Sequence, residues 1–243
     1  MSLIKEKLSM KPFGIVAHRG GGGESVENTV AGIEYALSIG ADIIEVDIRS
    51  TKDGRLILLH DPDLTRIAGI MQEVHDVDFD ELQKYKVFGK EPIATLNDAL
   101  HTVGGRCGLF LEVKEPEITE QVIKMVLQQG VKEWVAIISF YEEVIEKTKV
   151  MDPQITAGLV YSKPPGKIKE AKAIGADFVL PHYKIATQKA NRFAHALGLK
   201  VVAWTVNEES LMMECIEKGV DVVATDFPSM ALELREKMDA GRD

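Results

Sequence analysis

The feature that most constrains the fold is a short pattern that recurs along the chain: a glycine, a small or apolar residue, an Asp or Lys, and then a β-branched apolar run. Each glycine ends an amphipathic stretch, so it is a candidate helix C-cap that leads through a short loop into a strand. The apolar runs are continuous, which is typical of strands covered on both faces. The pattern predicts repeated helix–loop–strand units at GADIIEV from Gly40, GVKEWVAII from Gly130, GADFVL from Gly175, GLKVVAW from Gly198 and GVDVVAT from Gly219.

Three further apolar runs complete the series, namely GIVAH from Gly14, GLFLEVK from Gly108 and ITAGLVY from Ile155. Helical stretches separate the resulting eight strands within a chain of 243 residues. Eight βα units over this length predict a closed parallel barrel, the (β/α)8 TIM barrel of the α/β class. A doubly wound open sheet is the alternative.

One interval, between Arg55 and Thr95, breaks this rhythm. The stretch LILLHD follows the turn signal at residues 52–54 and predicts an additional short strand. The polar residues that follow, with scattered aromatic side chains, indicate a small insertion after the second strand, at about residues 61–94, over one end of the barrel. No linker or low-complexity segment divides the chain, so residues 1–243 are interpreted as a single barrel domain.

Charge and apolar content exclude several classes of protein. The formal net charge is −9, whereas a general nucleic-acid binder needs a basic surface. No apolar run is long enough to span a bilayer, and the N-terminus has neither the apolar core nor the cleavage site of a signal peptide. The two cysteines lie in apolar surroundings and are interpreted as core residues. These observations favour a cytoplasmic protein that does not bind nucleic acid.

Polar side chains lie at the strand ends where a barrel carries its chemistry. Alternate positions of IIEVDI carry Glu45 and Asp47, and alternate positions of LFLEVK carry Glu112 and Lys114. Because side chains alternate along a strand, the members of each pair point the same way. The other polar or aromatic residues at strand ends are His18, Arg19, His60, Trp204, Thr205, Thr225 and Asp226.

Three carboxylates at one barrel mouth need positive charge beside them, since a buried unpaired carboxylate costs roughly several kcal/mol. Arg19 and Lys114 supply part of it, and one divalent metal ion would supply the rest. The oxygen ligands of Glu45, Asp47 and Glu112 favour a hard ion, Mg²⁺ or Ca²⁺, with Mn²⁺ as a third candidate. The alternative is a buried salt-bridge network, with Glu112 on Lys114 and Glu45 or Asp47 on Arg19. A network for stability alone gains little over apolar packing, which favours the metal site.

Two of the six histidines are expected at the same barrel mouth as these acids, because His18 follows the first strand and His60 follows the additional strand. An imidazole titrates near neutral pH and can both accept and donate a proton, so we interpret this pair as general acid–base groups. His182 ends the sixth strand and either lines the mouth or packs beneath it. Surface or core positions are expected for the remaining three, His75, His101 and His195.

With a metal ion, Arg19 and Lys114 form a site suited to an anion such as phosphate. The glycines at 20–23 follow Arg19 directly. They can adopt positive φ and would let the backbone approach a substrate closely. We expect Glu27 and Asn28, just beyond this loop, to start the first helix.

Taken together, these motifs resemble those of the glycerophosphodiester phosphodiesterase family. They occur in the family's order over nearly the whole chain and are highly specific as a set, although each short motif alone is weak evidence. One departure is Val26, where the family usually has a proline that would stiffen the loop. The matching segments are HRG at 18–20, ENT at 27–29, EVDIRSTKDG at 45–54, LLHD at 58–61, LEVK at 111–114, ISF at 138–140, WTVN at 204–207 and ATDFP at 224–228.

The resemblance implies an enzyme that hydrolyses glycerophosphodiesters, such as deacylated phospholipid head groups, to sn-glycerol 3-phosphate and an alcohol. It also implies that the substrate's own 2-hydroxyl attacks phosphorus and that water then opens a cyclic phosphate. By position, His18 and His60 match the acid–base pair, Glu45, Asp47 and Glu112 the metal ligands, Arg19 and Lys114 the phosphate-binding residues, and Trp204 the residue that lines the glycerol end.

Two other functions stay open at this point. A lysophospholipase D-like or sphingomyelinase D-like enzyme would use the same barrel, but it would need a surface for lipid tails. The insertion offers no long amphipathic or basic stretch for that purpose. A non-catalytic phosphate- or metal-binding module is the second alternative, and the loss of a histidine or an acid would favour it. Every expected position is filled in this sequence.

Overall fold

The protein, described by a computed structural model over residues 2–240, is built on a closed barrel of parallel strands. Strand β1 pairs with β11 on one side and with β2 on the other, which closes the sheet. The strand order β1-β11-β10-β9-β8-β7-β6-β2 confirms the (β/α)8 barrel over the open sheet. The strands are β1 (Gly14–Ala17), β2 (Ile43–Ser50), β6 (Gly108–Val113), β7 (Val135–Ser139), β8 (Thr156–Tyr161), β9 (Phe178–Pro181), β10 (Lys200–Ala203) and β11 (Val222–Thr225).

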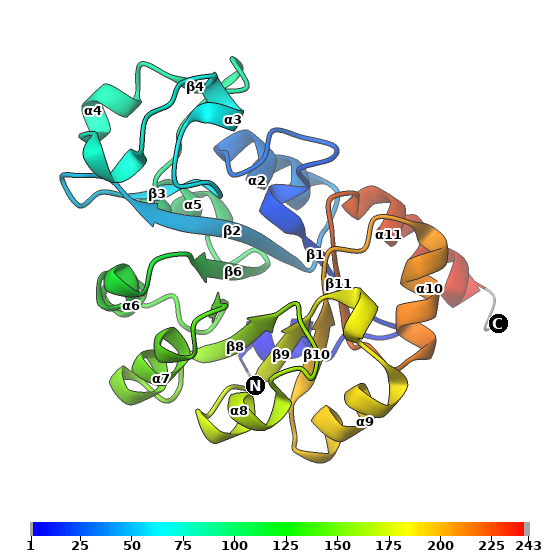
Figure 1. Ribbon diagram of the computed structural model, residues 1–243. Helices are drawn as coiled ribbons and strands as arrows, with labels where there is room; N and C mark the ends of the chain where they lie inside the picture. Colours follow the sequence, from blue (N-terminus) through cyan, green and yellow to red (C-terminus); the bar gives the residue numbers. More distant parts are fainter. Residues whose placement is uncertain (1, 241–243) are drawn as a thin grey trace.

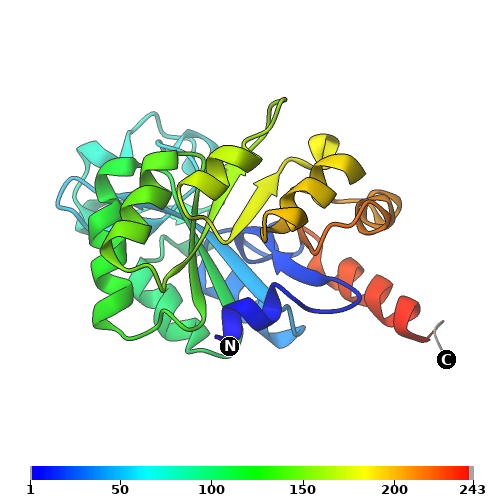
Figure 2. The same cartoon turned by 90° about the horizontal axis from the view of Figure 1, so that it is seen from below.

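Helices alternate with these strands and surround the barrel (Figure 1). A short helix, α1 (Leu3–Lys7), precedes the first strand, and Figure 2 shows it at the lower end of the barrel. The other helices around the barrel are α2 (Val30–Ser38), α5 (Leu96–Val103), α6 (Thr119–Gln128), α7 (Glu142–Met151), α8 (Ile168–Ala173), α9 (Gln188–Ala196), α10 (Glu209–Glu217) and α11 (Pro228–Ala240), with 3-10 turns η1 (His18–Gly20), η3 (Pro116–Ile118) and η4 (Tyr183–Ile185). Within residues 2–240, no helix is both long and apolar enough to cross a membrane.

The recurring glycines end helices, as the sequence pattern predicts. Each lies one residue beyond a helix C-cap, where a left-handed backbone lets the chain turn into the next strand. An L-residue with a Cβ rarely adopts this conformation, and glycine adopts it without strain. The five φ values are 83° at Gly40, 67° at Gly130, 80° at Gly175, 76° at Gly198 and 85° at Gly219.

The aspartates that follow three of these glycines tie each strand to the preceding one. Asp42 accepts a hydrogen bond from the backbone N–H of Ile15 at 3.0 Å. Asp177 accepts one from Ala157 and Asp221 one from Val201, both at 2.9 Å. Each carboxylate therefore satisfies a donor at the start of the neighbouring strand, where the barrel ladder offers it no partner. Each also bears a cationic partner, Arg235 on Asp42, Lys149 on Asp177 and Lys200 on Asp221.

Side-chain alternation divides the interior of the barrel from the layer under the helices. On β2, Ile44, Val46 and Ile48 pack against the surrounding helices, whereas Ile43 belongs to the cluster inside the barrel. Near the N-terminal end, Ile4 of α1 joins this inner cluster and closes the barrel from below. The interior is thus filled with apolar side chains up to the level at which the polar residues of β2 and β6 begin.

The additional strand predicted after β2 is β3 (Leu56–Leu58), which pairs antiparallel with β2. The segment that follows packs around its own apolar cluster, which includes Leu64, Ile67 and Val87. Figure 1 shows it beside β2 and α2, outside the ring of barrel strands. Its elements are α3 (Thr65–Ala68), η2 (Val74–Asp76), α4 (Phe79–Leu82), β4 (Lys86–Val87) and β5 (Glu91–Pro92).

We predict that Asp42→Ala lowers the free energy of unfolding by about 3 kcal/mol, because it leaves the buried N–H of Ile15 without an acceptor and the guanidinium of Arg235 without its carboxylate. Urea denaturation measures the effect. Asp76→Ala, at an exposed carboxylate of η2, is the control and should change the same quantity by no more than about 0.5 kcal/mol. Equal stability of the two variants would contradict the structural role of Asp42.

Candidate active site at the carboxyl ends of the strands

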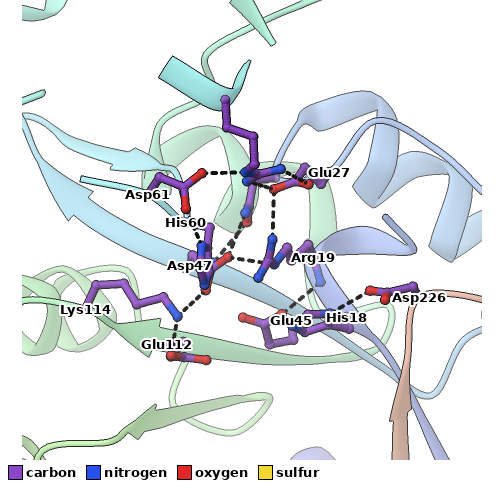
Figure 3. A network of polar contacts seen from close by, with 12 residues as sticks. His18, Arg19, Glu27, Glu45, Asp47, His60, Asp61, Glu112, Lys114 and Asp226 are labelled. Atoms are coloured by element: carbon purple, nitrogen blue, oxygen red, sulfur yellow. Dashed lines mark hydrogen bonds and ion pairs between the residues drawn. The ribbon is translucent and has the colours of Figure 1, made fainter. Parts of the chain in front are cut away.

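Three carboxylates from two neighbouring strands converge at the C-terminal end of the barrel. Glu45 and Asp47 lie on β2 and Glu112 lies on β6, where Asp47 and Glu112 are paired in register. One oxygen of each lies within 4.8 Å of the others, and all three residues are buried. The predicted convergence of the three acids is therefore what strand alternation and register produce (Figure 3).

Two cations lie against this cluster, and both form the ion pairs of the salt-bridge alternative. Lys114 Nζ lies 2.8 Å from Asp47 and also contacts Glu112. Arg19 Nε lies 3.3 Å from Asp47 Oδ2. These pairs leave the cluster incompletely satisfied, because the buried Oε1 of Glu45 has no hydrogen-bond partner.

The charge imbalance appears in the pKa values of the acids. Burial and the neighbouring charge of Asp47 raise the pKa of Glu45 well above the usual carboxyl range. The pKa of Asp47 is lowered despite its burial, because Lys114 and Arg19 stabilise its charge. One divalent cation would satisfy the unpaired oxygen of Glu45 and favour its ionised form. The donor set fits a hard cation, since all three groups offer carboxylate oxygens.

The backbone around Arg19 adopts strained conformations that direct hydrogen-bond donors to Glu45 and Asp47. Arg19 and Asn28 both have a φ of 53°, a left-handed conformation that is uncommon outside glycine. In this conformation the N–H of Arg19 donates to Glu45 Oε2 at 2.8 Å. The side chain of Asn28 donates to Asp47 Oδ2 at 2.8 Å and accepts from the Asp47 N–H at 2.9 Å. Asn28 therefore fixes the orientation of Asp47.

The segment after Arg19 corrects one expectation from the sequence. Residues 27 and 28 do not start the first helix. Helix α2 begins at Val30 with Thr29 as its N-cap, and the Thr29 side chain accepts from the N–H of Gly32. The glycine loop at 20–23, which precedes this helix, packs closely against other parts of the protein. At Gly23, for example, an added Cβ would lie 2.7 Å from the ring of Phe227. They allow close packing between segments of this protein.

His18 is oriented by a carboxylate from the opposite end of the chain. Its Nδ1 lies 2.7 Å from Asp226 Oδ1, and Asn207 donates to the other oxygen of Asp226 at 2.6 Å. A carboxylate only accepts, so Nδ1 carries the proton and Nε2 is left toward Glu45, 3.8 Å away. Burial lowers the pKa of His18, but the bond to Asp226 and the charge of Glu45 outweigh it and raise the pKa above the usual value of histidine.

His60 has a matching arrangement at the other side of the cluster. Its Nδ1 lies 2.8 Å from Asp61 Oδ1, and its backbone carbonyl accepts from Arg49 Nε at 2.9 Å. Burial lowers the pKa of His60 below the usual value, with help from the positive charges of Lys114 and Arg19. The pKa values of the two histidines are therefore shifted in opposite directions, which favours the protonated form of His18 and the neutral form of His60.

The other half of the mouth is apolar. A pocket that includes His18, Glu45 and Glu112 on one side is closed on the other by Trp204 and by Ile138 and Leu180. Trp204 Nε1 donates to the carbonyl of Leu180 at 2.7 Å, which fixes the plane of the indole. The mouth thus offers charged groups to one part of a ligand and an apolar wall to the other.

The structure gathers seven of the charged or titratable residues that the sequence marks for the mouth, with Trp204 in the wall of the adjoining pocket: His18, Arg19, Glu45, Asp47, His60, Glu112 and Lys114. Of the other histidines, His75 and His101 are exposed. His182 lies at the mouth and packs edge-on against Trp204 at 5.5 Å between ring centroids. His195 bonds to Asp221 on the far side of the barrel. The sequence did not predict that Asn28, Asp61, Arg66 and Asp226 orient other side chains of the site, although three of them lie within its motifs.

Comparisons with known proteins agree with this geometry. The model of the glycerophosphoryl diester phosphodiesterase family matches residues 18–230. A glycerophosphodiester phosphodiesterase of Caldanaerobacter subterraneus subsp. tengcongensis is 30% identical over 239 residues, which cover 92% of this chain and 98% of the relative.

Two solved structures have the same fold. A crystal structure from Silicibacter pomeroyi has a TM-score of 0.90 at 20% identity and covers 98% of each chain. A phosphodiesterase of Oleispira antarctica, solved with the product sn-glycerol-3-phosphate, has a TM-score of 0.83 at 24% identity and covers 93% of this chain and 96% of its own. As its motifs predict, the chain belongs to the glycerophosphoryl diester phosphodiesterase family and is an enzyme of the phosphoric diester hydrolase class.

Proposed function

We propose that this mouth hydrolyses glycerophosphodiesters to sn-glycerol 3-phosphate and an alcohol with one divalent metal ion and two histidines. The main observation in support is that His18 and His60 lie beside three buried acids, and that the Nδ1 of each histidine is hydrogen-bonded to a carboxylate. The product found in the Oleispira antarctica phosphodiesterase supports the same substrate class. We propose Glu45, Asp47 and Glu112 as the metal ligands, with Mg²⁺, Ca²⁺ and Mn²⁺ as the candidate ions.

A metal ion bound there would offset negative charge on the phosphoryl oxygens. Arg19 would contribute to the same task from the opposite side of Asp47, because its guanidinium is charged at every relevant pH. Lys114 would stay on Asp47 and Glu112 and hold them in place, with its remaining donor capacity available to phosphate. The apolar wall with Trp204 would take the glycerol end of the substrate.

The opposite pKa directions of the two histidines divide the chemical roles. Neutral His60 accepts the proton of the glycerol 2-hydroxyl as its oxygen bonds to phosphorus. The phosphorus bond to the departing alcohol breaks, and His18 gives that oxygen its proton. In the second half, His18 accepts a proton from water as the water oxygen bonds to phosphorus. The ring bond to the 2-oxygen then breaks, and His60 returns its proton there.

We predict that His18→Ala and His60→Ala each lower kcat by about 10²- to 10⁴-fold, because each removes one proton-transfer group. Release of glycerol 3-phosphate measures the rate, and circular dichroism checks the fold. His75→Ala, at an exposed histidine of η2, is the control and should keep the kcat of the parent protein. Near-normal turnover by either mouth variant would remove that histidine from the mechanism.

We predict that a chelator abolishes turnover and that Mg²⁺, Ca²⁺ or Mn²⁺ restores it. The effective ion should also raise the melting temperature, because binding to the native state alone adds about 2.7 kcal/mol at 100 times the dissociation constant. Glu45→Gln should weaken the binding of the same ion in calorimetry, since it removes the ligand whose second oxygen has no other partner. Full activity in the chelator would refute the metal dependence.

We predict that an analogue of glycerophosphocholine that lacks the 2-hydroxyl is not cleaved, because the attacking oxygen is absent. The parent compound in the same assay is the control, and release of choline is the readout. Cleavage at the normal rate would instead indicate direct attack by water.

A panel of glycerophosphodiesters with different head groups, together with lysophosphatidylcholine, tests the substrate class itself. Release of glycerol 3-phosphate from the diesters is the expected result. Preferential cleavage of lysophosphatidylcholine would favour the lysophospholipase D-like alternative. No cleavage of any compound would favour the non-catalytic module.

A further inference from the structure

The two histidines differ in what holds their carboxylates. Asp226, the partner of His18, follows a barrel strand and is held by Asn207, which also accepts the N–H of Asp226. Asp61, the partner of His60, is the first residue of the inserted segment and is held from within that segment. Its second oxygen accepts from Nε of Arg66, on helix α3, at 2.5 Å.

The same guanidinium holds a second carboxylate of the site. Nη1 and Nη2 of Arg66 donate to the two oxygens of Glu27, at 2.8 and 2.7 Å. Glu27 Oε1 also accepts from Nη1 of Arg19 at 3.1 Å. A chain of hydrogen bonds therefore runs from His60 through Asp61, Arg66 and Glu27 to Arg19.

This chain bears on substrate binding because it ends on Arg19. Arg19 already lies between Asp47 and Glu27, and its positive charge is needed for phosphate. Burial raises the pKa of Glu27, but the hydrogen bond from Arg66 outweighs it and lowers the pKa, which keeps Glu27 ionised and engaged. Without Arg66, Glu27 would turn wholly to Arg19 and compete with the phosphate for it.

The position of Arg66 depends on the fold of the inserted segment. Helix α3 is anchored by Ile67 and by Leu64 before it, which are buried with Val87 in the cluster of that segment. The guanidinium also lies over the ring of Phe88, 5.7 Å from its centroid. The Arg66 side chain is 40% exposed, and ion pairs at such exposure contribute little stability. A contribution to stability alone is thus a weak account of a guanidinium whose Nε, Nη1 and Nη2 all bind site carboxylates.

We propose that Arg66 is a positioning residue of the reaction, which orients His60 through Asp61 and keeps Arg19 available to phosphate through Glu27. The inserted segment is thereby a working part of the active site. The proposal rests on the proposed function for its kinetic consequences, although its geometry can be tested without turnover.

The test is Arg66→Ala, assayed with a glycerophosphodiester that the parent protein cleaves. We expect kcat to fall by about 10- to 100-fold, as for other residues that orient a reacting group through a partner, and KM to rise. Methylguanidinium in the buffer should restore part of the rate by occupying the space between Asp61 and Glu27. Arg66→Lys should give an intermediate loss, because one ammonium lacks the fork that binds two carboxylates at once.

Two controls separate positioning from stability. Ile67→Val loosens the packing of the same helix and leaves the ion pairs in place, so it should keep the parent kcat and KM at temperatures below its melting transition. Arg192→Ala removes an exposed arginine of α9 and should change nothing. Parent kinetics in Arg66→Ala would overturn the proposal. So would a loss that Ile67→Val reproduces and methylguanidinium does not restore.

A spectroscopic readout keeps this test separate from that of the proposed function. The Nδ1 proton of His60 should give a downfield NMR resonance, identified by its absence in His60→Ala, and Arg66→Ala should shift or broaden it. If the parent protein cleaves none of the diesters, the proposed function fails, and the resonance still decides the role of Arg66. An unaltered resonance would overturn that role.

Discussion

The structure of the mouth depends on one electrostatic constraint, the burial of three carboxylates within reach of one another on β2 and β6. Strand alternation and register make their convergence unavoidable once Glu45, Asp47 and Glu112 occupy these positions. Their surroundings compensate for it at a conformational cost, most clearly where Arg19 adopts a left-handed backbone to donate its N–H to Glu45. A cluster kept for stability alone would gain little over apolar packing, so the strain at this point supports the proposed metal site.

The two histidines beside this cluster have pKa values that are shifted in opposite directions. Both use Nδ1 on a carboxylate, which fixes the tautomer and leaves Nε2 for the proton transfers that we propose. Burial lowers the pKa of both, but the hydrogen bond to Asp226 and the charge of Glu45 outweigh it at His18. At His60 the pKa stays lowered, because the charges of Lys114 and Arg19 add to the effect of burial and oppose that of Asp47. Their different surroundings therefore separate the pKa values of two chemically identical side chains, which supports the proposed division into one acid and one base.

The barrel and the mouth residues could be predicted from the sequence because they follow from local periodicity. Glycine after a helix and alternation along a strand are short-range rules, and they located the eight strands and the three acids. The contacts that orient those residues join segments far apart in sequence, as Asp226 and His18 do, and no local pattern contains them. The glycines after Arg19 show the same limit, since their close neighbour Phe227 comes from the other end of the chain.

The two ends of the barrel use the same chemical group in contrasting ways. At the amino end, Asp42 accepts a hydrogen bond from a backbone N–H and pairs with Arg235, so the protein itself balances its charge. At the carboxyl end, Glu45 retains a buried oxygen with no hydrogen-bond partner. The difference is already present in the sequence, because Asp42 precedes its strand and Glu45 interrupts one. Glu45 lies within an apolar strand at the carboxyl end of the barrel, where the N–H of Arg19 satisfies one of its oxygens and leaves the other available to a cation.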